Sequence, residues 1–197
     1  MTGHTPVYQR VLGEDWLRLP EVTRQLHSPA PVSVFEGTAD IEGAEHPLAT
    51  LIAGRAGLPQ SGAGVPALIR VSMDGDTEII TRDYGGTVFE TRQSAVSTPR
   101  GMRLREQVGS VVFTLRLEAG PHGLDFHQES ATVMGVPLPE FLRPILHARE
   151  RADAGEHLFE VEVALPGLGR LVRYRGRLRP SGPGPVLPRS DEVKSPV

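Results

Sequence analysis

The sequence contains no cysteine. This absence excludes thiol catalysis, thiolate metal sites and disulfide bonds, and it fits a reducing compartment. No stretch approaches the roughly eighteen apolar residues that a transmembrane helix needs. The N-terminal sequence MTGHTPVYQRVLGEDW also lacks the basic segment and apolar run of a signal peptide. We therefore expect a soluble, cytoplasmic protein without a membrane span.

Aromatic residues are few, and neither sign of charge is in large excess. The net charge is −3 with the two signs interspersed, whereas a polyanion-binding protein carries clustered basic residues. Aromatic side chains make up only 5% of the chain, so there are few surfaces on which nucleic-acid bases could stack. We expect no nucleic-acid partner.

The motifs of common catalytic and cofactor sites are missing as well. None of the seven histidines has the H-E-x-x-H spacing of a zinc site. The segment GLGRLV lacks the third glycine of a dinucleotide fingerprint, and it joins two predicted strands rather than a strand and a helix. We predict no metal, no cofactor and no catalytic residue, and we favour a protein that is not an enzyme.

Strand patterns dominate the part of the chain after residue 31. The connections DGD, VG, AGPHG and PGLG are too short for parallel crossovers, so we predict a mainly β protein with an antiparallel meander sheet. Twist accumulates in a long sheet and free edges invite aggregation, so the sheet should be strongly curved or barrel-like. About ten strands are predicted, near 32–42, 66–73, 77–84, 87–93, 101–107, 110–118, 123–134, 145–151, 156–165 and 170–179.

Helices are predicted at two places. In about residues 7–27, apolar side chains recur at three- and four-residue steps, which indicates short helices packed across the sheet. The segment HPLATLIAGRAGLP predicts an inserted helix over about 46–57, with Pro47 at its start. We predict a single β-rich domain over 1–180, followed by a disordered tail rich in proline, glycine and serine over 181–197.

A symmetric turn at PGLG sets the register of the final hairpin. On its inner face this register pairs Phe159, Val161 and Val163 with Gly176, Tyr174 and Val172. On its outer face, Glu160 falls opposite Arg175. Glu162 likewise falls opposite Arg173, so the basic run RLVRYRGRLR is half neutralised. We interpret this run as a solvated surface; a polyanion site is the alternative.

A turn at ADAG would extend this register to the preceding strand. It places His147 opposite Glu160 on the outer face, with Leu146 and Ala148 pointing inward. A histidine in such a position is more typical of a surface charge ladder than of a catalytic site.

Polar residues interrupt an apolar face in the strand predicted at 123–134. Leu124 and Phe126 begin this face, which continues at the same parity to its end. Its later members are Gln128, Ser130, Thr132 and Met134. Inward polar groups need hydrogen-bond partners, which leaves two explanations: structural hydrogen bonds bridged by water, or the polar floor of a ligand cavity.

The segment GVPLPEFLRPILHARE has a different pattern from its neighbours. Pro139 can start a single helical turn, which Pro144 must end because it disfavours helical geometry at the preceding residue. This turn carries the apolar side chains of Leu138, Phe141 and Leu142. They either cover one end of the barrel as a lid, which we favour, or form a docking patch.

Several segments together resemble a bacterial family of domains of unknown function, DUF4166. They are VYQRVLGEDWLRLPEVTRQLH, RDYGGTVFETRQ, GVPLPEFLRP and, most specifically, HLFEVEVALPGLGRLVRYRGRL. The resemblance implies no established activity and transfers no catalytic residue. It implies a domain that occurs alone or fused to nicotinamide-dependent, reductase-like domains.

Three functions remain open at this point. We favour a non-catalytic binding domain for a hydrophobic or amphipathic small molecule. One alternative is an accessory module that docks on a nicotinamide-dependent oxidoreductase; another is a cofactor-independent enzyme in which Glu106 and Asp83 are the inward titratable candidates. The predicted ligand-binding residues are Gln128, Ser130, Thr132, Met134, Leu138, Phe141 and Leu142.

Overall fold

The structure is a computed structural model that describes residues 5–29 and 31–181. The predicted tail lies outside the described residues apart from Ser181. The helices are α1 (Val7–Leu12), the 3-10 helix η1 (Gly13–Arg18), α2 (Glu21–Leu26) and α3 (Pro47–Arg55). The strands are β1 (Val32–Gly43), β2 (Gly62–Asp74), β3 (Thr77–Tyr84), β4 (Thr87–Thr98), β5 (Gly101–Val108), β6 (Val111–Gly120), β7 (Gly123–Val133), β8 (Val136–Pro137), β9 (Ile145–Asp153), β10 (Glu156–Leu165) and β11 (Gly169–Pro180).

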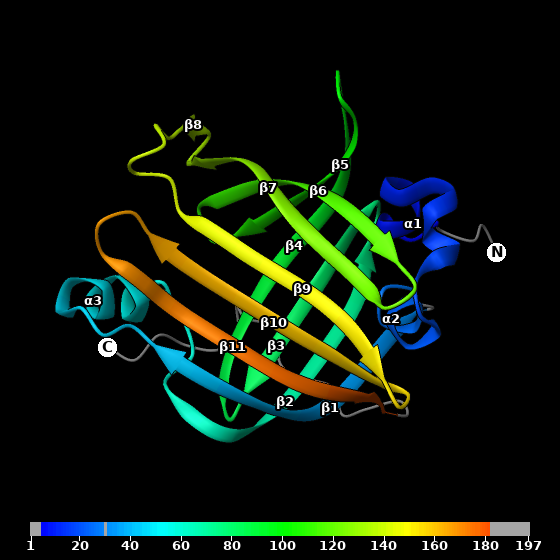
Figure 1. The fold of residues 1–197 in the computed structure, drawn as a ribbon, viewed down its shortest axis with the longest axis horizontal. Helices are drawn as coiled ribbons and strands as arrows, with labels where there is room; N and C mark the ends of the chain where they lie inside the picture. The colour runs from blue at the N-terminus through cyan, green and yellow to red at the C-terminus, as the bar shows by residue number, and fades with distance from the viewer. Residues whose placement is uncertain (1–4, 30, 182–197) are drawn as a thin grey trace.

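Ten of these strands form a closed antiparallel barrel (Figure 1). Strands β1 to β7 pair in chain order, β7 then pairs with β9, and β9 to β11 again pair in order. Pairing of β11 with β1 completes the ring, while the short β8 only extends the pairing of β7. The predicted antiparallel meander is confirmed, and the sheet closes so that every strand of the ring has two neighbours.

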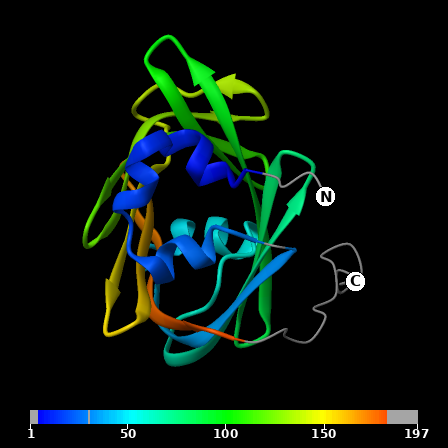
Figure 2. The same cartoon turned by 90° about the vertical axis from the view of Figure 1, so that its right-hand side faces the viewer.

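Helices lie at both ends of the barrel. The segment α1–η1–α2 crosses one end, which faces the viewer in Figure 2, and α3 lies at the opposite end (Figure 1). Val7, Tyr8 and Trp16 from the first segment are buried, so these helices are part of the core. In α3, Pro47 occupies the first turn and His46 Nδ1 accepts a hydrogen bond from the backbone N–H of Leu48.

The predicted register of the final hairpin is confirmed, and the register of the hairpin before it is corrected. The pairs Phe159–Gly176, Val161–Tyr174, Val163–Val172, Glu160–Arg175 and Glu162–Arg173 all occur between β10 and β11. Between β9 and β10, however, His147 pairs with Glu162 rather than Glu160. The turn consists of only Ala154 and Gly155, both with positive φ, which is typical of a type I′ hairpin. The shift is two residues, so His147 keeps its predicted outward face.

Ion pairs cover the outer face of β9, β10 and β11. Glu160 accepts hydrogen bonds from both Arg149 and Arg173. Oε1 of Glu156 lies 2.7 Å from Nε of Arg179, and its Oε2 lies 3.7 Å from Nη1 of Arg177. Ion pairs at a protein surface contribute only about 0–1 kcal/mol each. The basic run therefore meets carboxylates on the neighbouring strand, in line with our interpretation of it as a solvated surface.

A close approach at Gly176 generates a prediction about stability. A Cβ atom at Gly176 would lie 2.3 Å from the carbonyl oxygen of Thr38 and 2.8 Å from Cζ of Phe159. Gly176→Ala should therefore lower the free energy of unfolding by about 1–3 kcal/mol, as overpacking does. Urea unfolding followed by circular dichroism measures this. In the control Gly54→Ala, the new Cβ meets nothing within 4 Å and replaces a helical glycine, so stability should rise by up to about 1 kcal/mol. Equal effects of the two variants would contradict the packing at Gly176.

Candidate functional site

The barrel encloses a cavity of about 440 Å³. Side chains of the inner strand faces form its walls, Ile52 of α3 lines it from one end, and Tyr8 and His27 line it from the other. Much of the lining is aliphatic, and it includes Leu58, Ile69, Val71, Ile80, Val108, Leu146, Val161, Val163, Leu171, Val172 and Leu178. A mostly apolar wall of this kind is typical of sites for small molecules.

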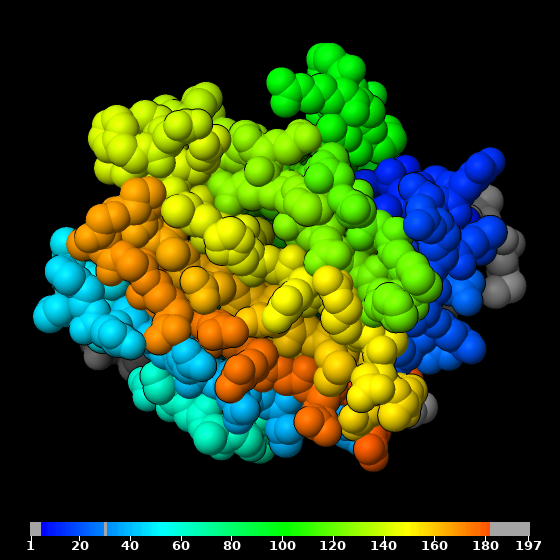
Figure 3. Space-filling model, in the orientation of Figure 1, coloured from blue at the N-terminus to red at the C-terminus, as the bar shows by residue number. Residues whose placement is uncertain are grey.

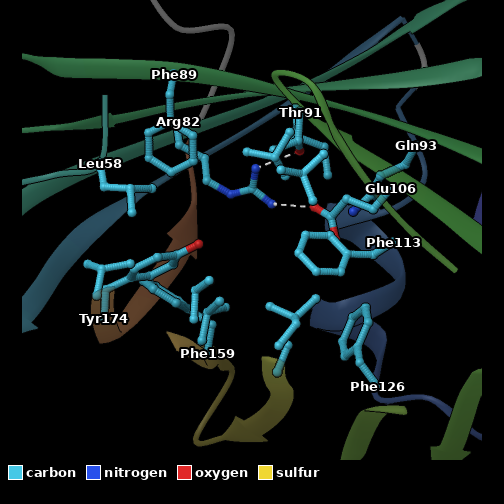
Figure 4. A pocket seen from close by; sticks show the side chains of 18 of the residues that line it. Leu58, Arg82, Phe89, Thr91, Gln93, Glu106, Phe113, Phe126, Phe159 and Tyr174 are labelled. Carbon is cyan, nitrogen blue, oxygen red and sulfur yellow. Dashed lines mark hydrogen bonds and ion pairs between the residues drawn. The ribbon is translucent and has the colours of Figure 1, made fainter. Parts of the chain in front are cut away.

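Four aromatic residues form a cluster on one side of the cavity. They are Tyr84, Phe89, Phe159 and Tyr174, and the rings of Tyr84 and Tyr174 are the closest pair, with centroids 5.4 Å apart. Burial raises the pKa of Tyr174 to about 12. Its hydroxyl group therefore stays protonated at neutral pH and remains a hydrogen-bond donor, and in Figure 4 it points toward Arg82.

Arg82 is the central polar residue of this wall. Its Nη1 donates a 2.7 Å hydrogen bond to Oγ1 of Thr91, and its Nη2 lies 3.7 Å from Oε1 of Glu106 (Figure 4). The guanidinium also lies over the ring of Phe89, 5.6 Å from the ring centre. The predicted inward position of Glu106 is confirmed. That of Asp83 is wrong, because Arg82 faces inward and its neighbour in the strand must face outward; Asp83 accepts a hydrogen bond from the backbone N–H of Gly86.

Gln93 adds an unpaired polar atom to the same wall. It pairs with Glu78 on β3 and with Glu106 on β5, so the three side chains share the inner face. Gln93 is only 2% exposed, it lines the cavity, and its Oε1 has no hydrogen-bond partner among the described residues. An unpaired buried acceptor costs free energy, and a bound donor would recover it.

A second polar group lies where the N-terminal helices close the barrel. His27, at the end of α2, bonds through Nε2 to Oε2 of Glu150 at 3.0 Å, and its Nδ1 lies 4.0 Å from Oε2 of Glu78. The other oxygen of Glu78 accepts a 2.7 Å hydrogen bond from the backbone N–H of Val7. The ring of Tyr8 stacks on that of His27 with centroids 3.6 Å apart. This histidine–glutamate cluster (His27, Glu78, Glu150 and His157) ties the helical segment to strands β3, β9 and β10.

The charges in this cluster follow from burial and from the mutual distances. Burial opposes the charge on His27, but Glu150 and then Glu78 outweigh it, so the pKa of His27 is raised. Burial also opposes ionisation of Glu150, and His27 outweighs it, so the pKa of Glu150 is lowered. Burial raises the pKa of Glu78 in spite of the nearby His27. Both shifts favour a buried ion pair between His27 and Glu150.

His157 differs from His27, although both contact Glu150. Its Nε2 lies 3.9 Å from Oε1 of Glu150, and its Nδ1 lies 3.4 Å from Oγ1 of Thr23. Burial lowers the pKa of His157 to about 4, since the attraction of the more distant Glu150 does not offset it. His157 is therefore neutral at neutral pH.

This cluster was not predicted from the sequence, because its members lie far apart in the chain and form no motif. The available signal was the alternation of side chains along a strand, in which residues two positions apart share a face. Glu150 has the parity of Leu146 and Ala148, which were predicted to point inward, and His157 has the parity of Phe159. Only the pairing of β9 with β10 and the docking of α2 bring these groups together.

A β-bulge turns part of the face of β7 that was predicted to point inward away from the barrel interior. Leu124 and Phe126 line the core as predicted, but Glu129 is an extra residue between the pairs Leu115–Gln128 and Thr114–Ser130. Beyond the bulge the parity reverses. Ala131 is now buried opposite Phe113, so Ser130 and Thr132 face outward and Met134 is exposed. Gln128 has a structural role: its amide donates to the carbonyl of Pro144 and accepts from the backbone N–H of Leu146.

The predicted lid also lies elsewhere. A turn does form at Pro139, with hydrogen bonds from the backbone N–H of Leu142 to Pro139 and from that of Arg143 to Glu140. Its side chains point away from the barrel, since Phe141 is 70% and Leu142 54% exposed and neither lines the cavity. Leu138 is half-buried and does not line it either. The lid interpretation is therefore wrong, and Figure 3 shows this segment as a projection at one end of the molecule.

The described part of the chain has neither a cluster of metal ligands nor a membrane-spanning helix. There, no group of three or more histidine, aspartate and glutamate residues is arranged to hold a metal ion. No helix among residues 5–29 and 31–181 is long and apolar enough to cross a membrane.

A family comparison identifies the chain. The model of a domain of unknown function, DUF4166, matches residues 19–178. This range includes the polar wall at Arg82 and the whole histidine–glutamate cluster, whereas Tyr8 lies outside it. The chain belongs to the DUF4166 family. No curated protein matches this DUF4166 chain in sequence. Among solved structures, a secretary abundant heat soluble (SAHS) protein from Ramazzottius varieornatus is similar with a TM-score of 0.39 and 14% identity, over 75% of this chain and 93% of that one.

The low pKa of His157 predicts that acid destabilises the domain. Between the ordinary histidine pKa of 6.5 and the folded value of about 4, the unfolded chain binds a proton that the folded chain does not. The free energy of unfolding should therefore fall as the pH falls through this range, by on the order of 3 kcal/mol. His157→Gln should flatten this dependence in urea unfolding experiments, while His122→Gln, at an exposed turn, should keep it. An unchanged slope in His157→Gln would show that His157 is not held neutral.

Proposed function

We propose that this DUF4166 domain binds a hydrophobic or amphipathic small molecule inside its barrel. The observation that supports this most directly is the cavity of about 440 Å³, which lies within the size range of small-molecule sites. Its wall combines aliphatic and aromatic side chains with a few polar groups, Arg82, Glu106 and Gln93, that could orient a ligand. No metal or cofactor is needed for such binding.

Filling the cavity tests this function. Ala148 lines the cavity from β9, whereas its neighbour His147 points outward from the same strand. Ala148→Trp should weaken binding of the neutral fluorescent probe N-phenyl-1-naphthylamine by about tenfold or more, because the indole would occupy the ligand's space. Fluorescence titration measures the affinity, and circular dichroism checks the fold. His147→Trp should bind the probe like the wild type. Failure of the wild type to bind any apolar probe would refute the proposal.

A second candidate function is docking on a partner protein. It is favoured by the apolar projection between β7 and β9, where Met134, Val136, Phe141 and Leu142 are all exposed. Exposed contiguous apolar side chains mark interaction surfaces in many proteins. The partner that the family resemblance suggests is a nicotinamide-dependent oxidoreductase, in keeping with a bacterial accessory module.

The docking function has its own test. The double variant Phe141→Ser, Leu142→Ser should lose an oxidoreductase that the wild type retains when it is purified gently from its own cells. Leu17→Ser is the matched control, since Leu17 is 72% exposed on η1 at the other end of the barrel. Each buried leucine or phenylalanine side chain contributes about 1.5–3 kcal/mol, so the loss should be nearly complete. Retention of the partner by the double variant, or recovery of no oxidoreductase, would count against docking at this surface.

A further inference from the structure

Three polar side chains on adjacent strands form the polar centre of the cavity wall. Arg82 on β3, Gln93 on β4 and Glu106 on β5 all face the interior (Figure 4). The bond to Thr91 holds one side of the Arg82 guanidinium, while Glu106 remains 3.7 Å from the other side. This distance is longer than a hydrogen bond, so both charged groups can still bond to a ligand.

The buried basic groups of the interior each lie beside a carboxylate. Arg82 lies beside Glu106, and His27 lies between Glu150 and Glu78. Arg55 and Arg149 also line the cavity, but both are exposed. A ligand carboxylate bound to Arg82 would therefore be close to the carboxylate of Glu106 in a region of low dielectric, where like charges repel strongly. The interior is unsuited to an anionic head group.

Gln93 indicates what the head group must supply. Its buried Oε1 has no partner among the described residues and needs a hydrogen-bond donor. Arg82 offers donors and needs an acceptor. A hydroxyl or carboxamide group carries both a donor and an acceptor without a net charge, whereas a carboxylate has only acceptors.

Resting on the proposed binding function, we propose that the ligand is an uncharged amphiphile whose hydroxyl or carboxamide group lies between Arg82, Glu106 and Gln93. Its apolar part lies along the aromatic cluster of Tyr84, Phe89, Phe159 and Tyr174, which adjoins Arg82.

The test compares ligands that share one chain and differ in head group. Dodecanamide, dodecan-1-ol and dodecanoate compete with N-phenyl-1-naphthylamine for the wild-type protein at neutral pH, below the concentrations at which they form micelles. The amide and the alcohol should displace the probe at concentrations about tenfold or more below those needed for dodecanoate, because buried like charges and unpaired polar groups disfavour the carboxylate. Equal or tighter binding of dodecanoate would overturn the inference.

Two variants locate the head group. Glu106→Gln removes the repelling charge and should strengthen binding of dodecanoate by about tenfold, so the preference narrows or reverses. Gln93→Leu should weaken binding of the amide by about tenfold relative to binding of the apolar probe, because it removes one acceptor of the head group. The matched control is Gln107→Leu, since Gln107 is exposed next to Glu106 and donates to the carbonyl of Gly109. It should change neither affinity.

The outcomes separate this inference from the function on which it rests. If neither the probe nor any of the three amphiphiles binds the wild type, the binding function itself fails. If the probe binds and dodecanoate competes as well as the amide, the cavity is a ligand site but its preference for an uncharged head group is refuted. If the preference exists but Gln93→Leu and Glu106→Gln leave it unchanged, the head group lies elsewhere in the cavity.

Discussion

Backbone pairing between β1 and β11 closes the sheet, and the interior depends on this closure. An eight-stranded barrel is just wide enough for side chains to fill, and the diameter grows with the number of strands. Ten strands therefore leave space that the inward side chains of this chain do not occupy, and the helices at both ends enclose it. The cavity is thus a consequence of strand number and pairing.

Because the closed barrel excludes water from much of its interior, the polar groups there need partners within the protein. A charge that is removed from water needs a partner, because desolvation is costly. The structure meets this requirement twice, with His27 beside Glu150 under the N-terminal helices and Arg82 beside Glu106 on the cavity wall. The first pair fastens the helical segment to the barrel, since α2 holds His27 against β9. The second pair leaves donors and acceptors directed into the cavity. The proposed preference for an uncharged ligand follows from the same pairing of charges.

Much of the fold could be predicted from local patterns in the sequence, and most of the site could not. Alternation and short turns gave the hairpin order and the inner face of the last hairpin, because antiparallel pairing is local and turn length sets register. The bulge at Glu129 has no local signature, and it reversed the predicted faces of Ser130 and Thr132. The turn before β10 consists of only Ala154 and Gly155, which is shorter than predicted. The pairing partner of His147 is therefore Glu162 rather than Glu160.

Groups brought together by long-range pairing were the least accessible to sequence analysis. His27, Glu78 and Glu150 come from three elements far apart in the chain, and only closure and helix docking place them in contact. The inward position of Glu106 was predicted, but its partner Arg82 was not, since β3 and β5 meet only across β4. The exposed position of Phe141 and Leu142 likewise depends on the path of the chain between β7 and β9.

The proposed function requires that the barrel interior holds a small molecule. Native mass spectrometry of the protein, purified gently from its own cells, can detect such a complex. We expect one chain bound to one small molecule, whose added mass disappears when the protein is denatured. A spectrum that shows only the bare chain, or the chain bound only to another protein, would refute this function and favour the surface at Phe141 and Leu142 as the functional part of the molecule.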